Sequence, residues 1–118
     1  MTGERVLARF KQRLARRGAL LTVYRKPSAA GGSESSQSIR FIINAIDPKG
    51  IEKLRMNGIL NANDANTKWF VCAGDANVKE ATDQIVLGDW RYRLASVEPE
   101  YVADVAVHIN CIGVREEV

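Results

Sequence analysis

The sequence has few of the residue types that active-site chemistry usually needs. It contains one histidine, His108, and two cysteines, Cys72 and Cys111. No serine or cysteine stands in a nucleophile-elbow pattern, and the glycines form no phosphate-binding loop. The acidic residues Asp75, Asp83 and Asp89 flank predicted turns, where aspartate is common because its side chain hydrogen-bonds to the backbone. Because catalysis and metal binding need converging polar groups, we expect that the chain is not an enzyme and that it holds no metal or cofactor.

The two cysteines do not make a disulfide framework. Each lies in an apolar, strand-like run, and neither has a second cysteine or a histidine at metal-ligand spacing. A bridge or a metal site is the alternative. Two buried free thiols are the better interpretation of cysteines in such runs.

Long apolar runs are missing as well. None reaches the roughly 18 residues that a membrane-spanning helix needs, and basic residues interrupt every apolar stretch near Met1, so that no secretory signal is predicted. An Arg-rich start would also suit a mitochondrial transit peptide. We expect a cytoplasmic protein without a membrane partner, folded as one domain over residues 1–118.

The charged residues, by contrast, are unevenly distributed along the chain. Residues 1–26 hold eight basic residues against Glu4 alone, a net charge of +7, which leaves −4 on the other residues of a chain whose total is +3. A basic arm on a mildly acidic body favours docking to an acidic protein surface or to nucleic acid.

Residues 4–17 carry the periodicity of an amphipathic helix. Thr2 suits the N-cap and Gly18 the end of the helix, so that residues 1–18 are predicted to form a basic N-terminal helix. Apolar side chains three and four residues apart give one stripe, namely Val6, Leu7, Phe10 and Leu14. At about 100° per residue, a second stripe is wholly basic and consists of Arg5, Arg9, Arg13 and Arg16.

Like charges four residues apart repel one another on a helix. The basic stripe is therefore tolerated best where an anionic surface lies opposite it, although a solvated basic face is the alternative. We predict that these four arginines bind a partner.

The remaining chain alternates β-forming runs with turn signals. Between the runs, residues 51–66 read as a short helical or irregular excursion and residues 78–83 as a linker or one helical turn. The predicted strands are residues 19–25, 39–46, 67–73 and 85–87, a run from Trp90 that ends at Pro99, and residues 102–114.

Residues 26–38, with the sequence KPSAAGGSESSQS, have no apolar anchor. Such a tract is predicted to be a mobile loop, and at full extension it reaches about 40 Å. Loops of this length inside a compact domain commonly carry function. We expect it to become ordered on assembly and assign partner binding to Ser28, Gly31, Gly32 and Ser33.

The strongest hairpin signal is Gly88-Asp89 between two strand-like runs. After the turn, Trp90, Tyr92 and Leu94 share one face and are predicted to be core. Arg91 and Arg93 share the other face and are predicted to point outward and to bind a partner. The aromatic residues of the two strands could instead form a base-stacking platform; core packing is the preferred interpretation for Trp69, Phe70, Trp90 and Tyr92.

These elements predict a mainly β protein. One N-terminal α-helix precedes five or six short strands, and no βαβ alternation indicates a parallel sheet. A small antiparallel β-barrel or sandwich with long loops, the barrel occupying residues 19–114, fits this order best.

From Ile39 onward the layout resembles a known family. A strand enters Asp47-Pro48-Lys49-Gly50-Ile51, and an aromatic strand at Trp69-Phe70-Val71 follows. Asp83-Gln84-Ile85-Val86-Leu87-Gly88-Asp89 then leads into the alternating strand from Trp90, which closes on Val97-Glu98-Pro99. This order resembles the small head–tail joining proteins of long-tailed bacteriophages, the head-completion or stopper class. The likeness covers residues 19–114, whereas the four-arginine helix matches that class less well.

The resemblance implies a role as well as a fold. It implies a homo-oligomeric ring in the virion neck, assembled in the host cytoplasm, that joins the portal or an adaptor protein to tail proteins. The ring would help to retain packaged DNA, which it contacts without sequence specificity. No catalytic residues are expected in that class.

Three other functions stay open at this point. A nucleic-acid-binding barrel would place the basic helix on phosphates and the aromatics under bases. A tail-completion or tail-terminator protein would share the same barrel. A regulatory domain of a larger complex is a further alternative.

Overall fold

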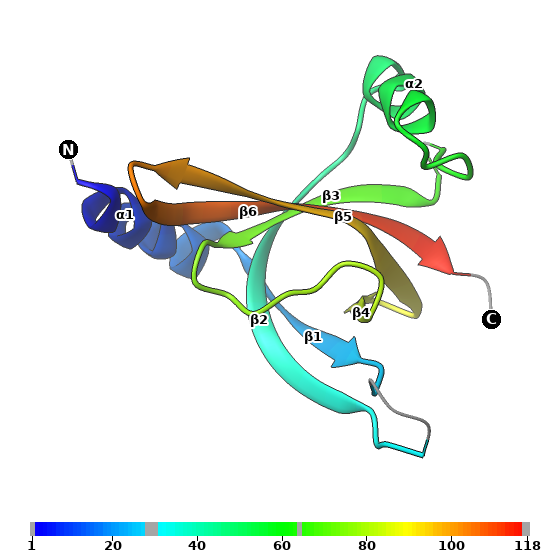
Figure 1. The fold of residues 1–118 in the computed structure, drawn as a ribbon, viewed down its shortest axis with the longest axis horizontal. Coiled ribbons are helices and arrows are strands. Elements are labelled where there is room, and N and C mark those ends of the chain that lie inside the picture. Colours follow the sequence, from blue (N-terminus) through cyan, green and yellow to red (C-terminus); the bar gives the residue numbers. More distant parts are fainter. Residues whose placement is uncertain (1, 28–30, 64, 117–118) are drawn as a thin grey trace.

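The computed structural model describes residues 2–27, 31–63 and 65–116. All strand pairs among them are antiparallel, and the strands close into a barrel in the order β1-β2-β3-β6-β5-β4 (Figure 1). The predicted mainly β class, an antiparallel barrel with an N-terminal helix, is confirmed. The elements of these residues are α1 (Gly3–Arg17), β1 (Ala19–Arg25), β2 (Ser35–Asn44), α2 (Pro48–Met56), β3 (Thr67–Ala73), β4 (Asp83–Leu87), β5 (Trp90–Val102) and β6 (Val105–Glu116).

The barrel core is built around three aromatic rings. Phe41 and Phe70 pack edge to face with ring centres 5.9 Å apart, and Phe70 and Tyr92 do so at 5.5 Å. A Cβ atom at Gly113 would lie 2.7 Å from the Phe70 ring. Glycine at this position of β6 therefore makes room for the ring, and the edge-to-face contacts add to the gain from burial.

The short strand β4 closes the barrel over only part of its height. It pairs with β1 at Val23–Arg25 and with β5 at Trp90–Arg93. Beyond these pairs the connection between β3 and β4 covers the wall: Ala76 and Val78 pack against the core, and the Ala81 N–H donates to the Leu94 carbonyl at 2.8 Å. This linker, predicted for residues 78–83, thus completes the barrel wall.

The prediction that β5 ends at Pro99 is wrong. The strand continues to Val102 and stays paired with β6, with Pro99 opposite Ile109. Because β4 stops pairing at Arg93, this half of β5 has a neighbour on one side only. A proline is accepted at such an edge, where its missing N–H costs no ladder hydrogen bond.

Strand β2 begins earlier than predicted. It starts at Ser35 rather than Ile39 and pairs with β1 as far as Ser35 opposite Arg25. Four residues of the predicted loop 26–38 are therefore strand. The serine-rich composition did not indicate a strand, because these residues are held in the sheet by backbone pairing and not by apolar side chains.

Helix α2 accounts for the first part of the excursion predicted at residues 51–66. Asp47 caps it by accepting from the Gly50 N–H at 2.7 Å, and Pro48 occupies its first turn. Ile51 of the helix and Ala62 of the loop that follows it are both buried. Arg55 Nε of the helix donates to the Ala62 carbonyl at 2.7 Å. Helix and loop form one unit that stands off the barrel, whereas α1 lies against it (Figure 1).

Candidate interaction surfaces

Helix α1 is anchored to the outside of the barrel by its apolar stripe. Thr2 caps it by accepting from the Arg5 N–H at 3.4 Å, Leu14 is buried, and the Phe10 ring lies 5.4 Å from the His108 ring on β6. At its start, a Cβ atom on Gly3 would lie 2.6 Å from the Val102 carbonyl oxygen. The predicted helix is confirmed, and its apolar stripe faces the barrel.

The basic stripe of α1 faces solvent. All four of its arginines are exposed. Lys11 on the same helix is paired with Asp75, whereas the side chains of Arg5, Arg13 and Arg16 make no ion pair or hydrogen bond within the described parts of the chain. The helix thus presents a row of guanidinium groups whose donors are largely available to an anionic partner.

The loop between β1 and β2 is shorter than the sequence suggested. Ser28 lies outside the described residues. Gly31, Gly32 and Ser33 are exposed, and Gly31 has a positive φ of 84° with nothing within 4 Å of the position that a Cβ would take. The three residues therefore form part of an open surface next to the start of β2.

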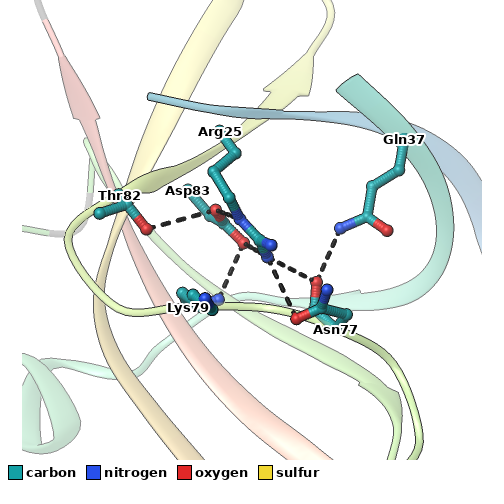
Figure 2. Close-up of polar contacts among 6 residues, drawn as sticks. All are labelled: Arg25, Gln37, Asn77, Lys79, Thr82 and Asp83. Atoms are coloured by element: carbon teal, nitrogen blue, oxygen red, sulfur yellow. Dashed lines mark hydrogen bonds and ion pairs between the residues drawn. The ribbon is translucent and has the colours of Figure 1, made fainter. Parts of the chain in front are cut away.

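A partly buried ion pair holds the base of this loop, and sequence reasoning missed it. Arg25 donates through Nε and Nη2 to the two carboxylate oxygens of Asp83 at 2.8 and 3.0 Å, and Figure 2 shows the pair, which joins β1 to the first residue of β4. The Asp83 side chain is fully buried, and it also accepts from the Lys79 backbone N–H at 2.8 Å. The carboxylate hydrogen bonds raise the pKa of the Arg25 guanidinium, although burial opposes them.

The same cluster reaches β2. Nη2 of Arg25 also donates to the Asn77 carbonyl at 3.0 Å, and Nε2 of Gln37 donates to that carbonyl at 2.7 Å (Figure 2). One carbonyl thereby connects two neighbouring strands to the covering segment. The polar groups of this cluster form hydrogen bonds with one another, so its role is to hold the strands together and not to react with a substrate.

The hairpin arginines face away from the core, as predicted, but they are not loose. Arg91 lies over the Tyr24 ring at 4.3 Å and donates to Gln84 at 3.2 Å and to Glu34 at 3.5 Å. Arg93 is half-buried and also interacts with other residues. Both side chains are therefore held to the barrel wall, which reduces the donors that they can offer to a partner.

Trp90 is not the core residue that the sequence predicted. Tyr92 and Leu94 are buried, but Trp90 is 43% exposed, and Cζ of Arg115 lies 4.1 Å from its ring centre. Trp90 has the alternation of a core residue, but it is the first residue of β5 and lies at the barrel rim. There a guanidinium covers one side of the ring.

Trp69 is likewise partly exposed, whereas its neighbour Phe70 is fully buried. Consecutive residues of a strand point to opposite faces, so only one of them can enter the core. The Trp69 Nε1–H donates to Asn110 Oδ1 at 3.1 Å, and Asn110 Nδ2 donates to Glu100 at 3.4 Å. This fixes the indole on the outer face of the sheet.

Trp69 forms part of a groove between the outer face of the sheet and α2. The groove has a volume of about 440 Å³. Its apolar lining comes from Ile46, Leu54, Trp69 and Ile112, and polar and charged residues, among them Lys53 and Glu98, also line it. Sequence reasoning missed it because it depends on where α2 stands relative to the barrel. The only signal in the sequence was that Trp69 comes directly before Phe70 in the strand, so that the two side chains must point to opposite faces of the sheet.

Reactive groups are few in the described residues. Cys72 and Cys111 are free and buried, as predicted. Their mutual hydrogen bond and their burial raise the pKa of the Cys111 thiol well above its ordinary range, which keeps this sulfur protonated and a poor nucleophile. In the described ranges no three histidine, cysteine or acidic side chains gather as a metal site. Neither α1 nor α2 is long and apolar enough to cross a membrane.

Comparison with known proteins adds no relatives. No protein-family model matches the chain, and no curated protein matches it either.

Proposed function

We propose that the chain is a structural subunit of a bacteriophage neck, forming a homo-oligomeric ring that joins the portal or an adaptor protein to the tail and helps to retain packaged DNA. Its place would be the virion, after assembly in the host cytoplasm. It would act by binding rather than by catalysis. The resemblance of residues 19–114 to head-completion proteins motivates this role.

The observation that carries the proposal is the arginine row of α1. A helix that is fixed to a rigid barrel by one side and offers the unpaired guanidinium groups of Arg5, Arg13 and Arg16 on the other is preorganised for an anionic partner. A ring neighbour, a portal subunit and DNA all supply such a surface. The α2 unit and the start of β2 project from other parts of the barrel (Figure 1), so one subunit can contact several neighbours at once.

The test uses the full-length chain at rising concentration, alone and mixed with a portal ring of a long-tailed phage. Negative-stain images and sedimentation velocity should show ring-sized particles, alone or seated on the portal. A heterologous interface that closes by rotation is what such a ring requires. A chain that remains monomeric in both samples would contradict the proposal. Rings that bind tail tubes but not portals would favour the tail-completion role.

The arginine row also supports a second candidate function, nucleic-acid binding without other proteins. Adjacent arginines of the row are about 4.5 to 6 Å apart along the axis, since they are three or four residues apart and each residue rises 1.5 Å, and such a linear array can follow a phosphate backbone. Binding of the isolated chain to DNA that weakens by several decades between low and physiological salt would favour this function.

A further inference from the structure

A cationic pocket lies between α1 and the outer face of β6. Its volume is about 290 Å³, close to the lower end of the range for small-ligand sites, which is about 300–1,000 Å³. Three of the side chains that line it carry nitrogen donors and two are apolar, namely Arg9, Arg13, His108, Val6 and Phe10. No acidic residue of the described chain is among them. We call this site the α1–β6 pocket.

The packing of helix on strand positions the three donors. Arg9 and Arg13 are four residues apart on α1 and so lie along the same side of the helix. On β6, the residues before and after His108 are both buried, which turns the imidazole outward toward α1. The Phe10 ring lies 5.4 Å from the imidazole ring. Two regular elements, and not a loop, therefore fix the geometry of the pocket.

The helix brings no negative charge to this pocket. Arg13 makes no ion pair or hydrogen bond within the described parts of the chain, whereas Arg9 also interacts with another residue. Glu4, the single acidic residue of α1, comes nine residues before Arg13 and so lies about 180° away around the helix. At least one guanidinium group of the pocket is thus available to an external anion.

The sheet brings one carboxylate near the pocket. Glu100 is opposite His108 in the β5–β6 ladder, but its side chain accepts from Asn110 Nδ2 at 3.4 Å. Asp104 lies in the β5–β6 turn, four residues before His108, which places it roughly 13 Å away along the strand. Two guanidinium groups thus face one nearby carboxylate that is already hydrogen-bonded, and the pocket keeps a positive charge.

The chemistry of the lining favours a phosphate group. Guanidinium groups only donate hydrogen bonds, and an imidazole has at least one N–H donor, whereas the oxygens of a phosphodiester only accept. A protein segment would also bring backbone N–H donors, for which this lining offers few acceptors. Moreover, Arg9 and Arg13 belong to a row that runs from Arg5 to Arg16, about 16 Å along the helix axis. An anion that matches the whole row must repeat its charge, as the DNA backbone does.

We propose that the α1–β6 pocket holds a phosphate group of the DNA backbone. Arg9, Arg13 and His108 donate to its oxygens, and Phe10 packs against the adjoining sugar. Contacts of this kind fix a protein on DNA without reading its sequence. The inference rests on the proposed function, in which the α1 row meets an anion, and it identifies that anion.

The single histidine of the chain gives a direct readout. The C–H signals of the His108 imidazole are followed by NMR at physiological salt, in the full chain without a histidine tag. The probes are a short DNA duplex, inorganic phosphate and hexaglutamate. The duplex should shift these signals until the site is saturated, inorganic phosphate should shift them at higher concentration, and hexaglutamate should shift them least.

Two exposed arginines of α1 provide matched variants. Arg13→Gln removes a lining residue of the pocket, and Arg16→Gln removes the same charge from the row outside the pocket. Arg13→Gln should weaken DNA binding by about tenfold or more, because it removes charge-assisted hydrogen bonds. Arg16→Gln should weaken it by about threefold, as an exposed contact does. The circular dichroism spectrum of both variants should match that of the wild type.

Other results would overturn the inference. A shift with inorganic phosphate but not with the duplex would assign the pocket to a free phosphate compound. A shift as large with hexaglutamate as with the duplex would mean that the pocket recognises charge alone, as an acidic protein surface would require. Equal losses for the two variants, with unmoved His108 signals, would leave no role for the pocket.

The same samples separate this inference from the function on which it rests. Wild-type rings that leave the His108 signals unmoved by DNA overturn the phosphate site and leave the ring function standing. Saturable DNA binding at the pocket by a chain that forms no ring, alone or on a portal, supports the phosphate site and overturns the ring.

Discussion

Arg25 and Asp83 are 58 residues apart in the chain and meet in a bidentate ion pair, with Nε and Nη2 at 2.8 and 3.0 Å from the two carboxylate oxygens. The pair joins the end of β1 to the first residue of β4, the strand that closes the barrel, and the two residues are also opposite one another in the β1–β4 ladder. Its carboxylate is fully buried. The closure of this fold therefore depends on a polar contact as well as on its apolar core.

Asp83→Asn should destabilise the protein by roughly 3 kcal/mol, because it leaves a partly buried guanidinium without its counter-charge. Chemical denaturation followed by circular dichroism gives the free energy of unfolding. The control is the pair Lys11 and Asp75, which is exposed on both sides: Asp75→Asn should cost less than about 1 kcal/mol. Equal losses for the two variants would show that the Arg25–Asp83 pair has no special structural role.

The two aromatic residues at the start of β5 should respond very differently to truncation. Tyr92→Ala removes a buried ring that contacts Phe70 and should cost about 3–5 kcal/mol. Trp90→Ala removes a rim residue with one guanidinium contact and should cost about 1 kcal/mol. Thermal or urea unfolding of both variants measures this difference. A loss at Trp90 as large as that at Tyr92 would restore the core role that the sequence first suggested.

Replacing Arg5, Arg13 and Arg16 by glutamine should abolish attachment to the anionic partner while the barrel stays folded, because glutamine has nearly the same helix propensity as arginine. The measurements are partner binding at physiological salt and the circular dichroism spectrum. A matched variant replaces three exposed cations elsewhere, namely Lys26, Arg40 and Lys79. If both variants bind equally, net charge rather than the α1 row governs attachment.

Cys111 should resist thiol reagents in the folded protein. Its raised pKa leaves a smaller fraction of thiolate at any given pH than a free cysteine has, and burial also blocks access. Labelling with a disulfide reagent at pH 8 should be slow in buffer and fast in denaturant. Rapid stoichiometric labelling in buffer would contradict the described burial of both thiols.

The sequence predicted the barrel where local signals and burial agree. Gly88-Asp89 has the chemistry of a hairpin turn, and β4 and β5 indeed pair on either side of it. The next turn carries no such signal. Ala103 adopts a positive φ of 53° there, a conformation that alanine rarely takes, so the β5–β6 hairpin could not be foreseen and β6 begins at Val105 rather than at residue 102.

The misplacement of Trp90 has a different cause. Alternation tells which face of a strand a residue shares, but it does not tell how near the residue lies to the barrel rim. Contacts between distant segments are also hidden in one sequence. Nothing local joins Arg25 to Asp83, and the groove beside Trp69 exists only because α2 stands off the sheet. Of the predicted partner surfaces, the arginine row could be read from sequence because a single helix creates it.

The half-open edge of β5 has a consequence for how copies of this chain can meet. An unpaired strand edge is a template for adding strands from other chains without limit, which leads to fibres. Here Pro99 removes a backbone donor, and Glu98 and Glu100 would place like charges against one another if two such edges paired. Growth by backbone pairing is thus discouraged, even where many copies of the chain are crowded together.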